Sequence, residues 1–194
     1  MRKMSWIVAA AMAVASAGLL AQGRSRAGTG NPISESLRRQ WNSVSKNIAA
    51  SAEMMPESNY GFKPVDTVRT FGQVVAHVAG ANYLICSAAK GEKKSPYTED
   101  EFEKTLTAKA DIVKALTASL VYCDGQFTAL DDKSGAELVA MPFGMPKTAR
   151  AGALMMNVGH MNEHYGNLVT YFRIKGMVPP SSQTGPAATP RRNP

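Results

Sequence analysis

The chain has 194 residues, 44% of them hydrophobic, so one domain can bury a sizeable core without any covalent cross-link. Its formal net charge is +7, but six of the 22 basic residues lie at positions 2–26 and 191–192, and residues 32–180 hold sixteen basic and fifteen acidic side chains. Such a nearly neutral central part lacks the basic surface that phosphate binding needs, so we expect no nucleic-acid partner.

The first 21 residues have the layout of a secretory signal peptide. Arg2 and Lys3 form a positive start, residues 4–21 carry no charge, and small residues follow. A retained membrane anchor is the alternative, because 18 uncharged residues approach the length of a bilayer span. The many alanines favour cleavage, with Ala21 as the expected site. We therefore predict export to the periplasm or the extracellular space, with no stable membrane span after cleavage.

Four stretches of the remaining chain have helical apolar periodicity. In the first, Leu37, Trp41, Val44 and Ile48 recur at three- and four-residue spacing. The second is apolar almost all round, which predicts deep burial. The four predicted helices cover residues 34–55, 70–89, 107–130 and 148–175.

The connections between these helices are long and rich in Pro, Gly and polar residues. Residues 56–66 and 131–147 are predicted loops, whereas residues 98–101 match a capping box and predict one additional helical turn. The fold class is therefore all-α, a four-helix bundle over residues 34–180. A flexible lead at 22–33 precedes it, and a disordered tail at 181–194 follows it.

Cys86 and Cys123 lie on two different predicted helices. In an oxidising compartment they could form a disulfide that joins one helix to the next. Two buried free thiols fit the sequence equally well. The sequence leaves both alternatives open.

The chain has three histidines, and all of them are candidate metal ligands. His160 and His164 are four residues apart, so both imidazoles lie on one face of the fourth helix. His77 lies in the middle of the most apolar helix, where a buried imidazole must stay neutral and find a hydrogen-bond partner. Three core histidines with local partners are the alternative. We instead predict one divalent transition metal held by the three imidazoles, with an open position for water.

Glu163 lies close to the histidine stripe of the fourth helix. We predict a catalytic role as general base; a role as an anchor for a ligand, or a simple ion pair, is the alternative. The string from His160 to His164 also matches the inverted zinc-peptidase motif, but no acidic residue follows Glu163 to complete that ligand set. Further polar candidates for the surroundings of the site are Gln73, Asn157, Asn167 and Tyr171.

These motifs resemble the DinB-like family of four-helix metalloproteins. The string R-T-F-G-Q from Arg69 leads to His77, H-x-x-E-H-Y-G-N-L-V-x-Y-x-R begins at His160, and G-x-V-P-P-S-S begins at Gly176. An upstream M-P-E-x-x-Y-x-F-x-P from Met55 also fits. The resemblance spans about residues 35–182. It implies a bundle with long crossover connections and a zinc or nickel ion bound by His77, His160 and His164.

Some proteins of that family are thiol-dependent transferases or other metal-dependent enzymes, and dimers occur among them. The resemblance therefore implies a metal-dependent enzyme of hydrolase or transferase type, acting on a small-molecule substrate as a monomer or homodimer. One alternative is a non-catalytic, metal-stabilised bundle with a binding or structural role in the cell envelope. Another is a surface-anchored interaction protein that keeps its N-terminal segment.

Overall fold

The computed structural model describes residues 30–183, so the predicted signal peptide and most of the predicted tail lie outside the described residues. Four long helices dominate this part of the chain, and each matches its prediction to within two residues at both ends. The prediction of an all-α four-helix bundle is confirmed. None of the described helices is long and apolar enough to cross a membrane. The four helices are α1 (Pro32–Met54), α2 (Phe71–Lys90), α4 (Lys109–Ala129) and α6 (Arg150–Ile174).

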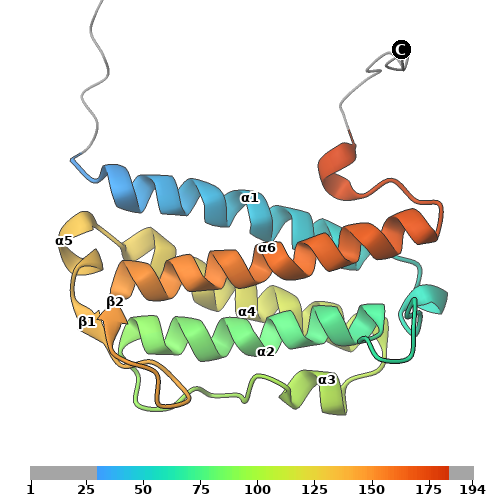
Figure 1. The fold of residues 1–194 in the computed structure, drawn as a ribbon, viewed down its shortest axis with the longest axis horizontal. Coiled ribbons are helices and arrows are strands. Elements are labelled where there is room, and N and C mark those ends of the chain that lie inside the picture. The colour runs from blue at the N-terminus through green and yellow to red at the C-terminus, as the bar shows by residue number, and fades with distance from the viewer. Residues whose placement is uncertain (1–29, 184–194) are drawn as a thin grey trace, which may run out of the picture. The chain divides into compact units, whose positions relative to one another are not determined.

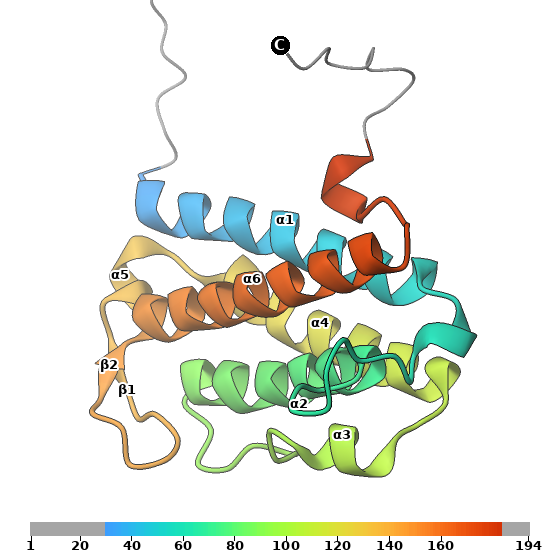
Figure 2. The same cartoon turned by 45° about the vertical axis from the view of Figure 1, so that its right-hand side comes forward.

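The four helices pack as a square, in which α1 and α2 each contact both α4 and α6 (Figures 1 and 2). Asn82 of α2 contacts Ser119 of α4, and Cys86, four residues later, is bonded to Cys123, also four residues later. The residue numbers rise in the same direction on both helices, so α2 and α4 are parallel. Parallel neighbours require a crossover. Residues 91–108 supply it by passing back along the outside of α2 (Figure 1).

The crossover contains the short helix α3 (Glu101–Thr105), which lies against α2. This confirms the predicted helical turn but not the full capping box. The Thr98 backbone N–H donates to the Glu101 carboxylate at 3.2 Å, whereas the Thr98 hydroxyl contacts Asp100 at 3.3 Å instead of a backbone N–H. The helix therefore begins at Glu101.

The prediction of a featureless loop at 131–147 was incomplete. It contains the one-turn helix α5 (Asp132–Gly135) and strand β1 (Leu138–Val139), which pairs antiparallel with β2 (Thr148–Ala149). The carboxylate of Asp132 accepts from the Ser34 backbone N–H at 2.8 Å and from its hydroxyl at 2.7 Å, so α5 caps the start of α1. Elements this short carry no measurable periodicity, which is why the sequence pattern missed them.

Two single-turn 3-10 helices complete the described chain: η1 (Glu57–Asn59) follows α1, and η2 (Pro180–Ser182) follows α6. Helix η2 takes in the first two residues of the predicted tail. The ordered chain therefore extends slightly past residue 180.

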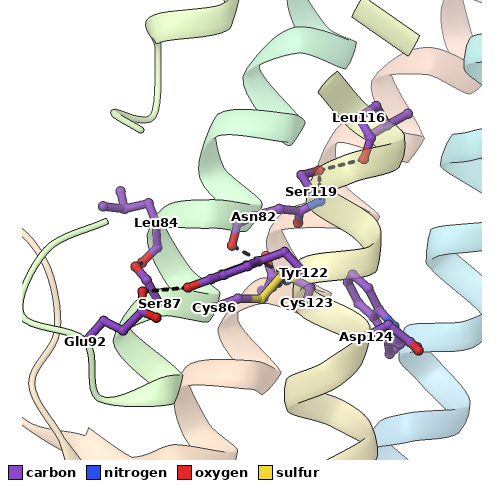
Figure 3. The surroundings of a disulfide bond; sticks show 12 residues. Asn82, Leu84, Cys86, Ser87, Glu92, Leu116, Ser119, Tyr122, Cys123 and Asp124 are labelled. Carbon is purple, nitrogen blue, oxygen red and sulfur yellow. Dashed lines mark hydrogen bonds between the residues drawn. A yellow bond between two sulfur atoms is a disulfide. The ribbon is translucent and has the colours of Figure 1, made fainter. Parts of the chain in front are cut away.

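Helix α2 is the most deeply buried of the four, as its apolar sequence predicts. Its C-terminal half is covalently joined to α4 by a disulfide between Cys86 and Cys123, whose Cα atoms are 5.4 Å apart (Figure 3). The two alternatives left open by the sequence are thus resolved in favour of the bridge. From α6, the buried amide of Asn157 points its nitrogen at the Cys86 sulfur at 3.5 Å.

Candidate metal centre

The packing of α2 against α6 brings all three histidines together. A capping box fixes the start of α2: the Gln73 backbone N–H donates to the Thr70 hydroxyl at 3.2 Å, and the Thr70 N–H donates to the Gln73 side chain at 2.9 Å. His77 then follows one turn after Gln73. The His160 Nε2 lies 3.1 Å from the His77 Nε2 and 3.0 Å from the His164 Nε2.

Burial keeps these imidazoles neutral. His77 and His164 are only 5% and 7% exposed, and His160 is partly buried. Desolvation by burial is the largest effect on each ring and lowers the pKa of all three to about 4, with repulsion between the rings acting in the same direction. At neutral pH each ring therefore keeps a lone pair, the form in which imidazole binds metals.

The arrangement fits a metal ion better than a hydrogen-bonded cluster. A neutral imidazole has one N–H and one acceptor nitrogen, yet the buried Nδ1 atoms of His77 and His160 have no hydrogen-bond partner. Their Nε2 atoms instead converge on one point. Metal–nitrogen bonds of about 2.0–2.1 Å in a tetrahedral site place ligand nitrogens roughly 3.3 Å apart, close to the separations found here. Within the described chain this is the one cluster of its kind.

Two acidic residues of the crossover approach the cluster, and the sequence analysis did not anticipate them. Glu103 of α3 lies 4.0 Å from the His77 Nδ1 and forms a two-pronged ion pair with Arg69, at 2.6 and 3.3 Å. Glu99, just before α3, places a carboxylate oxygen 3.7 Å from the His77 Nε2. Sequence spacing could not reveal these contacts because they depend on how the crossover lies over α2.

Glu163 is exposed, and neither a hydrogen bond nor an ion pair involves its side chain within the described residues. Beside His164, it lines the larger of two cavities that flank the cluster, with a volume of about 740 Å³. Arg69 lines this cavity and also the smaller one, about 280 Å³, which His77 and Glu99 line as well. The predicted role of Glu163 as a general base stays a prediction.

Of the four other polar candidates, one contacts the histidine cluster and three form hydrogen bonds elsewhere. Asn167 contacts the site, with its amide 3.4 Å from the His164 Nδ1; the amide oxygen is the atom that can accept from a protonated Nδ1. Gln73 is used in the helix cap. The Tyr171 hydroxyl donates to the Arg69 backbone carbonyl at 2.7 Å, and Asn157 contacts the disulfide. Three of the four therefore have other structural roles.

The architecture and the cluster together define a class: helical bundles with a long crossover that hold a candidate three-histidine metal centre between two adjacent helices. The chain belongs to the DinB superfamily, whose family model matches residues 40–168.

Relatives agree with this assignment. The uncharacterized protein YjoA of Bacillus subtilis (strain 168) is 28% identical over 126 residues, which cover 64% of this chain and 79% of that protein. A DinB-like protein from Bacillus cereus ATCC 10987 has a similar fold, with a TM-score of 0.63 and 16% identity over 75% of this chain and 95% of the other. YfiT from Bacillus subtilis, described as a probable metal-dependent hydrolase with an unusual four-helix bundle topology, gives a TM-score of 0.58 and 17% identity, covering 74% and 88%.

Proposed function

We propose that this protein is a metal-dependent enzyme of hydrolase or transferase type, in which His77, His160 and His164 bind one divalent ion, zinc or nickel. The observation that carries the proposal is the convergence of three neutral, buried imidazoles beside a cavity large enough for a small molecule. The description of YfiT as a probable metal-dependent hydrolase supports the same class of activity.

His77, His160 and His164 would hold the ion, which when bound would supply Lewis acidity that makes a water or thiol nucleophilic near neutral pH. The chain's own residues then have distinct tasks. The histidines present their lone pairs, Asn167 orients His164, and the ion pair between exposed Arg69 and partly buried Glu103 fixes the side of the cavity next to His77. We propose that Glu163, which lines the larger cavity, takes a proton from a substrate bound there.

Elemental analysis of the purified protein tests the proposal. About one equivalent of zinc or nickel should copurify, or bind on reconstitution, and should be lost in the double variant His160→Ala/His164→Ala. The variant Glu163→Gln is the matched control, because it alters an exposed side chain of the same helix and should keep the ion. Absence of metal from the parent after reconstitution would overturn the proposal.

A non-catalytic role for the ion is the second candidate, and one observation favours it. His77 is on α2 whereas His160 and His164 are on α6, so a bound ion would fasten two helices of the bundle together. This alternative predicts stabilisation by metal without any turnover. Screening ester, amide and thiol-transfer substrates with the metal-loaded protein and with the double His variant separates the two roles.

Export is part of the proposal, supported by the signal-peptide layout of residues 1–21 and by a disulfide, which persists in oxidising compartments. The proposed site of action is the periplasm or the extracellular space, with the protein as a monomer or homodimer. Intact-mass measurement on protein recovered outside the cytoplasm should show loss of about residues 1–21. A retained N-terminus would instead favour the surface-anchored alternative.

A further inference from the structure

The inference concerns Glu99 and rests on the proposed metal-binding function. The backbone before α3 passes unusually close to α2 at Gly80, one turn after His77. A Cβ built at Gly80 would overlap the carbonyl oxygen of Glu99 and would lie within 2.9 Å of that of Thr98. Only glycine allows this approach, and the approach brings a Glu99 carboxylate oxygen to 3.7 Å from the His77 Nε2.

Glu99 is one of two acids of this segment, with Glu101, that no lysine or arginine neutralises within the described residues; Glu101 instead accepts a hydrogen bond from the Thr98 backbone N–H at 3.2 Å. Asp100 is paired with Lys104, and Glu103 is paired with Arg69. The Glu99 carboxylate, 36% exposed, has the His77 ring as its one ionic neighbour among the described residues. Glu99 lines the smaller cavity beside the cluster, so its side chain is accessible to a molecule bound there.

Glu99 lies beside the three-histidine group without being part of it. The ligand atoms of His77, His160 and His164 all lie within 4.8 Å of one another, and Glu99 does not join that group. Its oxygen is 3.7 Å from the His77 Nε2. The carboxylate therefore lies on the His77 side of the cluster, where Glu99 and His77 line the same cavity.

We propose that Glu99 positions the molecule held at the three-histidine centre by accepting a hydrogen bond from its N–H or O–H group. The substrate class that this favours is one with a proton on the atom next to the reacting centre, such as an amide, a hydroxamate or an alcohol. Gly80 is the residue that makes the placement possible. Glu163, on the opposite flank and facing the larger cavity, does not take this role.

Two small probes of the Co²⁺-loaded full chain test the proposal through visible absorption, without any need to know the substrate. Acetohydroxamic acid carries an N–H group for Glu99, whereas azide has no proton to donate. Glu99→Gln keeps the shape of the side chain but removes its charge. It should weaken acetohydroxamic acid binding tenfold or more, because a charge-assisted hydrogen bond is lost, and leave azide binding unchanged or tighter.

Three variants complete the test. Glu53→Gln, at an exposed glutamate of α1, is the control and should change neither dissociation constant more than twofold. Gly80→Ala should displace residues 98–100 and repeat the effect of Glu99→Gln, whereas Gly159→Ala, at a helical glycine with open space around it, should not. A Glu99→Gln variant that binds acetohydroxamic acid as the parent does, or that loses azide to the same degree, overturns the role of Glu99.

The cobalt content of the same samples keeps the two proposals apart. One equivalent of cobalt in the parent, with an unchanged acetohydroxamic acid affinity in Glu99→Gln, overturns the inference and leaves the metal site standing. Absence of cobalt from the parent overturns both.

Discussion

Helix α2 contacts its two neighbours through two different polar links. In its first half, His77 faces His160 and His164 of α6. In its second half, Cys86 is bonded to Cys123 of α4. Both links are buried and both join segments far apart in the sequence. They differ in whether the chain alone completes the link or a bound ion is required.

The disulfide is complete within the chain itself. Two neighbouring asparagine amides bond to its surroundings, Asn157 to the Cys86 sulfur at 3.5 Å and Asn82 to the Ser119 hydroxyl at 3.1 Å. The histidine cluster, by contrast, brings three imidazole lone pairs together with no covalent bond between them. We therefore expect the link of α2 to α4 to be covalent and independent of ligands, whereas the histidine link to α6, within helices that already pack together, needs a bound ion to be complete.

The largest expected effect is the stabilisation that a metal ion adds through α6. Zinc in thousandfold excess over its dissociation constant should raise the free energy of unfolding of the metal-free protein by about 4 kcal/mol, because it binds only the folded state. Thermal denaturation with and without zinc measures this. The double variant His160→Ala/His164→Ala should show no such rise, and an equal rise in both proteins would mean that zinc binds elsewhere.

Removal of the disulfide should have the next largest effect. The bridge joins residues 37 positions apart, for which chain-entropy arguments give up to about 4 kcal/mol of stability. Urea denaturation of Cys86→Ala/Cys123→Ala should show a loss approaching this value, and reduction of the parent with a thiol should give a similar loss. The metal affinity should change less than tenfold. A large fall in affinity would show that the two links are coupled.

The histidine cluster, unlike the disulfide, should make the stability of the fold depend on pH. Burial lowers the pKa of His77, His160 and His164 from 6.5 to about 4 in the metal-free fold. Between these values the unfolded chain binds more protons than the folded one, so stability is lost as pH falls from about 6.5 to about 4. Denaturation at a series of pH values should give a shallower slope for His164→Asn. The slope should persist in the double cysteine variant, because cystine does not titrate in this range.

The sequence predicted the helices and the histidines well, for physical reasons that are local. Apolar spacing such as Leu37, Trp41 and Val44 marks a helix face without reference to the rest of the chain. The four-residue spacing of His160 and His164 likewise follows from helix geometry alone. The placement of His77 beside them was predicted because it is the remaining histidine that could complete a three-ligand site.

What the sequence could not supply was the packing of irregular chain on the helices. The contact of Glu99 with His77 depends on the path of the crossover, and Asp132 caps α1 from a turn 98 residues away from Ser34. For the contact of Glu99 with His77, the one local indication in the sequence is Gly80, because glycine inside an apolar helix often marks a close approach of another backbone segment. Gln73 and Tyr171 were candidates for the site by position but are engaged elsewhere by their hydrogen bonds.

The smallest expected effect tests whether α6 has a ligand-independent link to the start of α2. The Tyr171 hydroxyl donates to the Arg69 backbone carbonyl at 2.7 Å, just before the N-cap of α2. Tyr171→Phe removes this bond and should lower the free energy of unfolding by about 1 kcal/mol, measured by urea denaturation. Because the hydroxyl does not touch the histidines, the zinc dissociation constant should stay within twofold of the parent value. A larger weakening of zinc binding would mean that the Arg69 backbone helps to set the position of His77, and the link between α2 and α6 would then be partly preformed before any ion binds.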